Sequence, residues 1–163
     1  MEYPKRKNLR HTEHDYSAVG AYFLTICTQN KRCIFGTVKQ AEHVSEMPKC
    51  ILSPAGMIAS EWITRLPEHF PVQIPVFAVM PNHVHFIVEI EREQAANRST
   101  LSRLVGYYKM NAAKQIHAFM PDLEIWQRSY YDHIIRSEND YHNIADYIEN
   151  NAIKWLDDIY YQS

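Results

Sequence analysis

The chain has 163 residues, enough for one domain with an adequate hydrophobic core. Hydrophobic residues make up 46% and charged residues 22%, a composition typical of a folded globular protein. The net charge of −2 lacks the strongly basic character of a nonspecific duplex-binding protein. Three cysteines without Cys-x-x-Cys spacing argue against a disulfide framework or a zinc knuckle. With no signal-peptide pattern and no apolar run of about 18 residues, we expect a cytoplasmic protein outside the membrane.

Positive charge is unevenly distributed along the sequence. One cluster comprises Lys5, Arg6, Lys7 and Arg10, and a later series comprises Arg98, Arg103, Lys109 and Lys114. The ordinary interpretation of either group is a solvated face, and phosphate contacts are the alternative. We expect a single domain over residues 1–163, with residues 1–15 as a flexible basic arm.

In the first half of the chain, residues 21–28 are rich in β-branched and aromatic side chains and predict a strand. A second strand is expected over about 33–39, after a turn at 30–32. Ser53-Pro54 is typical of an N-cap followed by proline in the first helical position. This pattern predicts a helix that runs to about Leu66, before Pro67.

Two apolar, strand-like runs follow, over residues 76–80 and 83–90, separated by the turn signal Pro81-Asn82. In the second run, alternate residues share a face, so we expect the apolar face to be buried. That face consists of Val84, Phe86, Val88 and Ile90.

The last part of the chain predicts two helices around one strand. Apolar residues at helical spacing follow a Ser99 or Thr100 cap, from Leu101 to Ile116. A strand is expected within 125–136, and Ser137 begins a helix that reaches about Asn151. The order of elements predicts an α+β domain, with helices packed on an antiparallel β-sheet.

Two histidines separated by one valine, His83-Val84-His85, are the first candidate for a functional site. On a strand, side chains two residues apart point to the same face, about 6.6–7 Å apart. Two imidazoles there can bind one divalent cation, although such pairs are more often surface or hydrogen-bonded residues.

The last predicted helix supplies a second group of candidates. Its apolar stripe consists of Tyr141, Ile144, Ala145, Ile148 and Ala152. Tyr147 and Asn151 lie at the margin of that stripe, one turn apart. A tyrosine hydroxyl can attack phosphorus, with help because its free pKa is about 10. An amide oxygen is a plausible third ligand for a hard cation.

Simpler interpretations of these residues stay open at this point. The chain has 11 tyrosines, and most helical tyrosines serve packing or interfaces. Asn150 and Asn151 are ordinary residues for a helix end. Tyr107 and Asn111 repeat the Tyr-x-x-x-Asn spacing on the middle helix and are a genuine alternative to Tyr147 and Asn151.

Four segments in this order and spacing, AYFLTICTQNKRCIFG, VMPNHVHFIV, WQRSYYDHIIR and YIENNAIKW, resemble the single-tyrosine transposases of the HUH endonuclease superfamily. The closest likeness is to the REP-associated tyrosine transposases and their insertion-sequence relatives. It extends from about Tyr16 to Trp155, nearly the whole chain.

The resemblance implies a ferredoxin-like or RRM-like HUH endonuclease core. The family's His-hydrophobic-His motif falls on His83 and His85, its catalytic tyrosine on Tyr147, and its third metal ligand on Asn151. No such motif matches Tyr107. The implied reaction is Mg²⁺- or Mn²⁺-dependent cleavage of single-stranded DNA, with a 5′-phosphotyrosine link and a released 3′-hydroxyl. Relatives recognise DNA hairpins, and in some two protomers pair, so hairpin-bearing DNA and a second copy are the expected partners.

Further residues receive weaker expectations. DNA contacts are expected from basic and aromatic side chains on the middle helix and just before it: Arg98, Arg103, Tyr107, Tyr108 and Lys109. Gln127 and His133 match family segments, and we expect buried hydrogen bonding from them without a specific role. Ala152 stands where the family commonly has proline, which leaves every proposed ligand in place.

Two other functions compete with a DNA strand transferase. A catalytically silent nucleic-acid-binding module would keep the sheet and need no metal. A metal-dependent phosphoesterase that uses water would need a further base or a second histidine motif, and the sequence shows none at convincing spacing.

Overall fold

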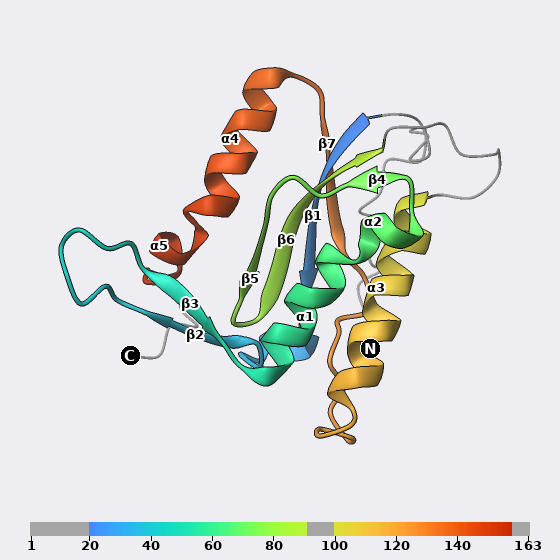
Figure 1. Cartoon of the computed structure of the whole chain (residues 1–163), viewed down its shortest axis with the longest axis horizontal. Coiled ribbons are helices and arrows are strands. Elements are labelled where there is room, and N and C mark those ends of the chain that lie inside the picture. The colour runs from blue at the N-terminus through green and yellow to red at the C-terminus, as the bar shows by residue number, and fades with distance from the viewer. Residues whose placement is uncertain (1–19, 91–99, 158–163) are drawn as a thin grey trace, which may run out of the picture.

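The computed structural model describes residues 20–90 and 100–157 (Figure 1). Its centre is a five-stranded antiparallel sheet in the order β4-β6-β1-β7, with β5 also paired to β6. The strands are β1 (Gly20–Cys27), β2 (Gly36–Lys39), β3 (Lys49–Leu52), β4 (Val72–Gln73), β5 (Phe77–Met80), β6 (His83–Ile90) and β7 (Tyr131–Ile135). The helices are α1 (Pro54–Thr64), α2 (Leu66–His69), α3 (Thr100–Ile116), α4 (Glu138–Glu149) and α5 (Asn151–Trp155), with the 3-10 turn η1 (Gln29–Lys31). The predicted α+β class is confirmed.

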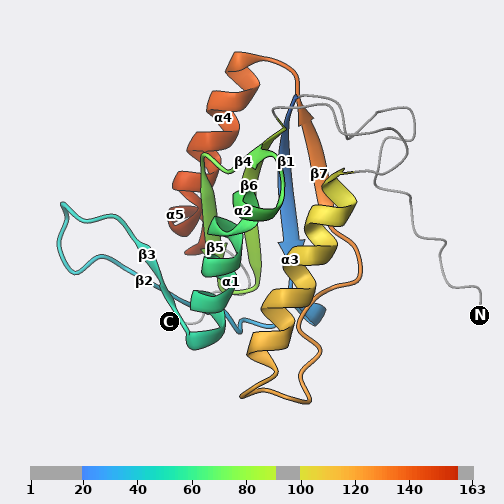
Figure 2. The same cartoon turned by 45° about the vertical axis from the view of Figure 1, so that its right-hand side comes forward.

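Helices cover both faces of the sheet (Figure 2). Helices α1 and α3 pack against each other and cover one face, whereas α4 contacts β5, β6 and β7 from the other face. Strands β2 and β3 form a separate hairpin that extends away from the sheet in both views (Figures 1 and 2).

The main core lies between the sheet and helices α1 and α3. Strands β1 and β6 contribute Tyr22, Leu24, Ile26, Val84, Phe86, Val88 and Ile90 to it. Burial of the apolar face of residues 83–90 is therefore confirmed. The opposite face is also mostly covered, because α4 lies over it, and His85 and Ile87 are 4% and 0% exposed.

Local sequence signals set most element boundaries. The Ser53 side chain accepts a hydrogen bond from Gly56 N at the start of α1, and Ser137 accepts one from Asp140 N at the start of α4. Strand β2 begins at Gly36 rather than near residue 33, because Phe35 N donates to Pro81 O in the β5–β6 turn. Strand β3 was not predicted, since four residues give too little alternation to detect.

The last helix differs from its prediction. Helix α4 ends at Glu149, and Asn150 leaves the helical conformation (φ −97°, ψ 12°) before α5 begins at Asn151. At this junction both the backbone N–H and the side-chain amide of Asn150 donate to Asp146 O, the side-chain amide at 2.8 Å. Tyr147 and Asn151 therefore lie on two consecutive helices, and the prediction of one continuous helix to about Asn151 was wrong.

Two expectations fall outside the described residues: the basic arm at 1–15 and Arg98. Within residues 20–90 and 100–157, no helix combines the length and the apolar character that crossing a membrane requires.

Candidate active site

The two histidines lie side by side on β6, directly after the Pro81-Asn82 turn. Their ring centroids are 4.2 Å apart and their planes are inclined by 65°. The same-face geometry predicted for His83 and His85 is therefore present. The turn that precedes them is buried, so the pair lies on well-packed backbone.

Each imidazole is oriented by a hydrogen bond at Nδ1. His85 Nδ1 lies 2.8 Å from Thr25 Oγ1 on the neighbouring strand, and His83 Nδ1 lies 2.7 Å from Asn82 Oδ1. A partner at Nδ1 fixes the ring and presents Nε2 outward, as in protein metal sites. His85 Nε2 is buried and has no hydrogen-bond partner in the described parts of the chain.

The electrostatic environment keeps His85 neutral. Burial, then the neighbouring His83 and then Lys31 lower the pKa of His85 well below its ordinary value. The neutral imidazole is the form that binds a metal. A buried, neutral ring with an unbonded Nε2 fits a divalent cation.

Tyr147 reaches the histidines from α4. Its ring centroid is 5.5 Å from that of His85 and 6.1 Å from that of Phe23, which it meets edge-to-face. Phe23 in turn stacks on His85, with 5.3 Å between centroids. Tyr147 is 37% exposed, so its ring is held by packing while part of it stays open to solvent. One chain therefore brings the predicted tyrosine to the predicted histidines.

Asn151 is the first residue of α5 and is 5% exposed. One turn later, the buried Trp155 ring lies 5.9 Å from the His83 ring, so α5 packs at the His83 end of the pair. Among the described residues, no group of three or more His, Cys, Asp or Glu side chains is arranged to hold a metal. The third ligand predicted from the sequence, the Asn151 amide, is of another residue type and stays a prediction.

The first half of α4 is tied to the sheet by two polar contacts. Asp140 Oδ2 accepts a hydrogen bond from His133 Nε2 on β7 at 2.9 Å, which lowers the pKa of Asp140. Burial and a hydrogen bond with Glu89 on β6 raise the pKa of Tyr141 to about 12. His133 thus makes the hydrogen bond expected of it, although it is half-buried rather than buried.

The residues proposed for DNA contacts on α3 lie on the other side of the sheet. The Tyr108 ring is fully buried and its hydroxyl donates to Ala59 O, so stacking on a base is excluded and that prediction was wrong. Lys109 Nζ donates to the carbonyls of Gln127 and Ser129, a structural role. Arg103 is exposed, and its contact with DNA stays a prediction.

The alternative pair on α3, Tyr107 and Asn111, makes contacts within that helix and with α2 and its end. Tyr107 packs beside His69 and Phe70, with ring centroids 4.8 and 5.5 Å away. The Asn111 amide donates to Tyr107 O within the same helix. Tyr107 and Asn111 therefore serve helix α3 and its packing.

The roles of several residues that shape the site were not predicted from the sequence. Thr25 and Phe23 face His85 only because β1 pairs with β6 in a register that sets Thr25 opposite His85. The alternation of β1 predicts which residues share a face, but the register depends on the whole sheet.

Gln127, for which buried hydrogen bonding was expected, is half-buried and takes part in hydrogen bonds through its backbone. Its N–H donates to Cys27 O, and its carbonyl accepts from Lys109 Nζ.

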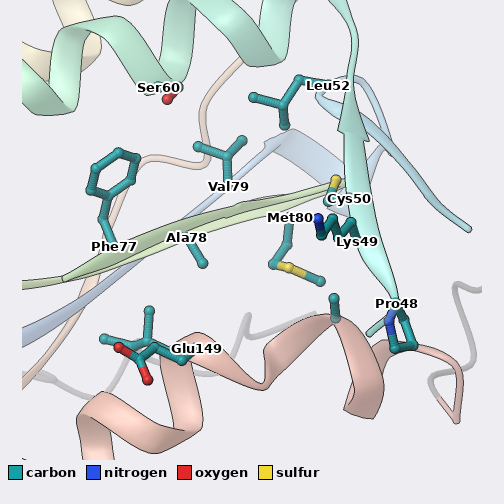
Figure 3. Close-up of a pocket in the computed structure, with 12 residues that line it drawn as sticks. Pro48, Lys49, Cys50, Leu52, Ser60, Phe77, Ala78, Val79, Met80 and Glu149 are labelled. Carbon is teal, nitrogen blue, oxygen red and sulfur yellow. The ribbon is translucent and has the colours of Figure 1, made fainter. Parts of the chain in front are cut away.

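A cavity of about 320 Å³ lies beside the site, between β5, β3 and the junction of α4 and α5 (Figure 3). Phe77, Val79 and Met80 line it from β5, and Glu149 from α4 (Figure 3). Its lining includes none of the four proposed site residues, so it is a neighbouring feature rather than the site itself.

The sequence matches a known protein family and several of its relatives. The family model described as transposase IS200-like matches residues 20–151. A Haemophilus influenzae protein described only as uncharacterized is 31% identical over 174 aligned residues, covering 96% of this chain and 93% of its own. A putative REP-associated tyrosine transposase from the same organism is 22% identical and covers 86% of this chain and 74% of its own.

One solved structure shares the fold. It is described as a REP-associated tyrosine transposase bound to a REP hairpin, with a TM-score of 0.58 and 20% identity. The match covers 89% of this chain and 73% of the other. Since the family model spans most of the sequence, including both histidines and Tyr147, the chain belongs to the IS200-like transposase family.

Proposed function

We propose that this transposase cleaves and rejoins single-stranded DNA through Tyr147, with a divalent cation held by His83, His85 and Asn151. The observation that carries the proposal is the single-chain approach of the Tyr147 ring to within 5.5 Å of the His85 ring. Beside that contact, His85 keeps a buried Nε2 that has no hydrogen-bond partner among the described residues.

The donor set suits Mg²⁺ or Mn²⁺. Two neutral imidazoles and one amide oxygen leave most coordination positions for water and substrate oxygens. When bound, the cation supplies charge neutralisation at the scissile phosphate. Thr25 and Asn82 orient the imidazoles, and the packing of α5 brings Asn151 to the protein interior.

The chemical step requires one bond to form and one to break. The Tyr147 hydroxyl oxygen attacks phosphorus and loses its proton, while the bond from phosphorus to the 3′ oxygen breaks and that oxygen gains a proton. The products are a 5′-phosphotyrosine and a free 3′-hydroxyl. The same hydroxyl attacks in reverse to rejoin strands, because the ester conserves the energy of the broken bond.

The substrate proposed is single-stranded DNA that carries a hairpin. The solved relative is described as bound to a REP hairpin, and transfer of that preference to this chain is part of the proposal. Because one chain supplies both the histidines and Tyr147, we propose that the site is complete within a protomer. Pairing of two copies is then a separate property, to be tested by sedimentation.

The test is formation of a covalent adduct. Hairpin-bearing single-stranded DNA with a 5′ or 3′ label is incubated with protein and Mg²⁺, and products are separated under denaturing conditions. We expect the 3′-labelled fragment to become linked to the protein through its 5′ phosphate and the 5′-labelled fragment to be released with a 3′-hydroxyl. Both products should disappear with EDTA and in Tyr147→Phe. Tyr131→Phe is the matched control, because Tyr131 is another exposed tyrosine whose ring contacts Phe23.

An adduct that persists in Tyr147→Phe contradicts the nucleophile. Hairpin binding without any adduct, unaffected by EDTA and by His83→Ala, supports the silent binding module instead. Cleavage without a covalent product supports hydrolysis by water.

A further inference from the structure

A strained turn follows β1 and stands next to the histidine pair. Asn30 and Lys31 both have left-handed backbone conformations, with φ of 55° and 57°. For residues other than glycine such conformations are uncommon and persist where surrounding contacts enforce them. Two consecutive left-handed residues therefore indicate that surrounding contacts hold this turn in one conformation.

One of the residues that hold this turn, Asn82, also orients a histidine. The Thr28 hydroxyl lies 2.8 Å from Arg32 O and 3.0 Å from Asn82 O. Asn82 Nδ2 lies 3.4 Å from Lys31 O, while Asn82 Oδ1 is the partner of His83 Nδ1. Asn82 thus links the turn to the proposed metal site.

The side chain that this turn presents is a lysine. Lys31 Nζ donates to Cys27 Sγ at 2.9 Å, and Cys27 is the direct cross-strand neighbour of His83. Residues directly opposite each other on antiparallel strands share a face, so the ammonium group stands on the face of the sheet that carries His83. A thiol is a weak acceptor, so a phosphate oxygen can replace it at little cost.

A second lysine stands at Tyr147. Lys154 Nζ, from α5, lies 4.4 Å from the centre of the Tyr147 ring. Lys154 is exposed, so its ammonium group is accessible to a ligand that reaches Tyr147. The two lysines come from different elements: Lys31 follows β1 and stands near His83, and Lys154 of α5 stands over the Tyr147 ring.

We propose that Lys31 and Lys154 bind the DNA backbone next to the scissile phosphate. Lys31 contacts a phosphate at the histidine end of the site, and Lys154 contacts one at the Tyr147 end. This arrangement explains how a chain with a net charge of −2 holds a polyanion, because the positive charge is local to the reacting centre. The inference rests on the proposed function for the path of the strand.

The test measures phosphate contacts directly. Binding of a fluorescent hairpin-bearing single strand is measured in the Tyr147→Phe background, which prevents cleavage and keeps the ring under Lys154. Each lysine–phosphate contact to a single strand contributes about 0.7 to the slope of log affinity against log salt concentration. We expect Lys31→Gln and Lys154→Gln each to lower that slope by about 0.7, and the Arg variants to retain it.

Lys39→Gln is the matched control, since Lys39 is an exposed lysine on the β2–β3 hairpin, away from the histidine pair. If Lys31→Gln fails to fold, Lys31→Met provides a second neutral side chain of similar length. Slopes that match the control in both variants overturn the proposal, because a purely structural lysine leaves the salt dependence unchanged. If both slopes match the control while the wild-type protein forms the covalent adduct, only the lysine contacts are refuted. If the slopes are lowered but the wild-type protein forms no covalent adduct, the lysine contacts are supported and the proposed cleavage is refuted.

Discussion

The two faces of the sheet differ in what their side chains do. Toward α1 and α3, strands β1 and β6 send apolar residues such as Leu24 and Phe86 into one continuous core. Toward α4 and α5, the same strands send Thr25 and His85, which hydrogen bond to each other beneath Tyr147. Because strand residues alternate between faces, the chain separates stability from chemistry at neighbouring positions. Substitutions on the core face are therefore expected to leave the chemistry largely intact, and substitutions on the histidine face are expected to leave stability largely intact.

The largest expected effect is on the core face. Phe86→Ala is expected to lower the free energy of unfolding by about 3–5 kcal/mol, because the ring is fully buried and its loss leaves a cavity. Urea denaturation followed by circular dichroism measures this change. Phe119→Ala is the control, since Phe119 is 49% exposed and should change stability by about 0.5 kcal/mol or less. Equal effects of the two substitutions would show that this face is not the core.

The next effect is on the chemical face, one strand away. Thr25→Val keeps the shape of the side chain and removes the hydroxyl that contacts His85 Nδ1. Loss of such a supporting hydrogen bond typically weakens metal affinity by about 10–100-fold. The Mn²⁺ concentration that gives half-maximal adduct formation should rise accordingly, with little change in stability. Thr37→Val, an exposed threonine on β2, should leave it unchanged. An unchanged metal requirement in Thr25→Val would argue that His85 does not bind the cation.

The two faces also differ in how well the sequence predicts them. The core face was predictable, since Val84, Phe86, Val88 and Ile90 stand at every second position and Ser53 and Ser137 mark the starts of their helices clearly. On the other face, the histidines and Tyr147 were found from spacing and family motifs. Their neighbours were not found, because Thr25 meets His85 only through the strand register.

Tyr108 and Asn150 show the limits of local patterns. Tyr108 was expected to contact DNA because it adjoins basic residues, but helical periodicity places it on the apolar stripe of α3 and in the core. The break at Asn150 is not recorded by helical periodicity, and its side-chain bond to Asp146 O does not explain it, because Asn111 makes the same bond inside the continuous helix α3. The Tyr108 error arose because its position next to basic residues was given more weight than the periodicity that places it in the core.

A smaller effect is expected at the two helix caps, one for each face. Ser137→Ala removes a cap on α4 and should cost about 1 kcal/mol. Ser53→Ala on α1 should cost about 2 kcal/mol, since its hydroxyl also donates to Ile34 O at 2.6 Å. Adduct formation should slow more in Ser137→Ala than in Ser53→Ala, because only α4 carries Tyr147. Measuring both the unfolding free energy and the adduct rate for each variant separates the two roles. The opposite ranking of adduct rates would argue against α4 as the element that positions the nucleophile.

The smallest effect concerns pH and again distinguishes the faces. Burial and Glu89 raise the pKa of Tyr141 to about 12 from an ordinary value of about 10. The folded chain therefore holds this proton more tightly than the unfolded chain does. Its contribution to stability is complete below about pH 10 and is lost as the pH rises toward 12.

Tyr141→Phe should therefore flatten the fall of the melting temperature between about pH 10 and 12, compared with the control Tyr131→Phe. The change should be modest, because the side chain is only partly shielded from solvent. An identical fall in both variants would mean that Glu89 does not hold α4 through Tyr141. Between α3 and α1 the Tyr108 hydroxyl donates to Ala59 O, and full burial raises its pKa well above the ordinary value, whereas Tyr141 on α4 is only partly shielded. Alkaline pH should therefore loosen the helix of the nucleophile before it affects the core.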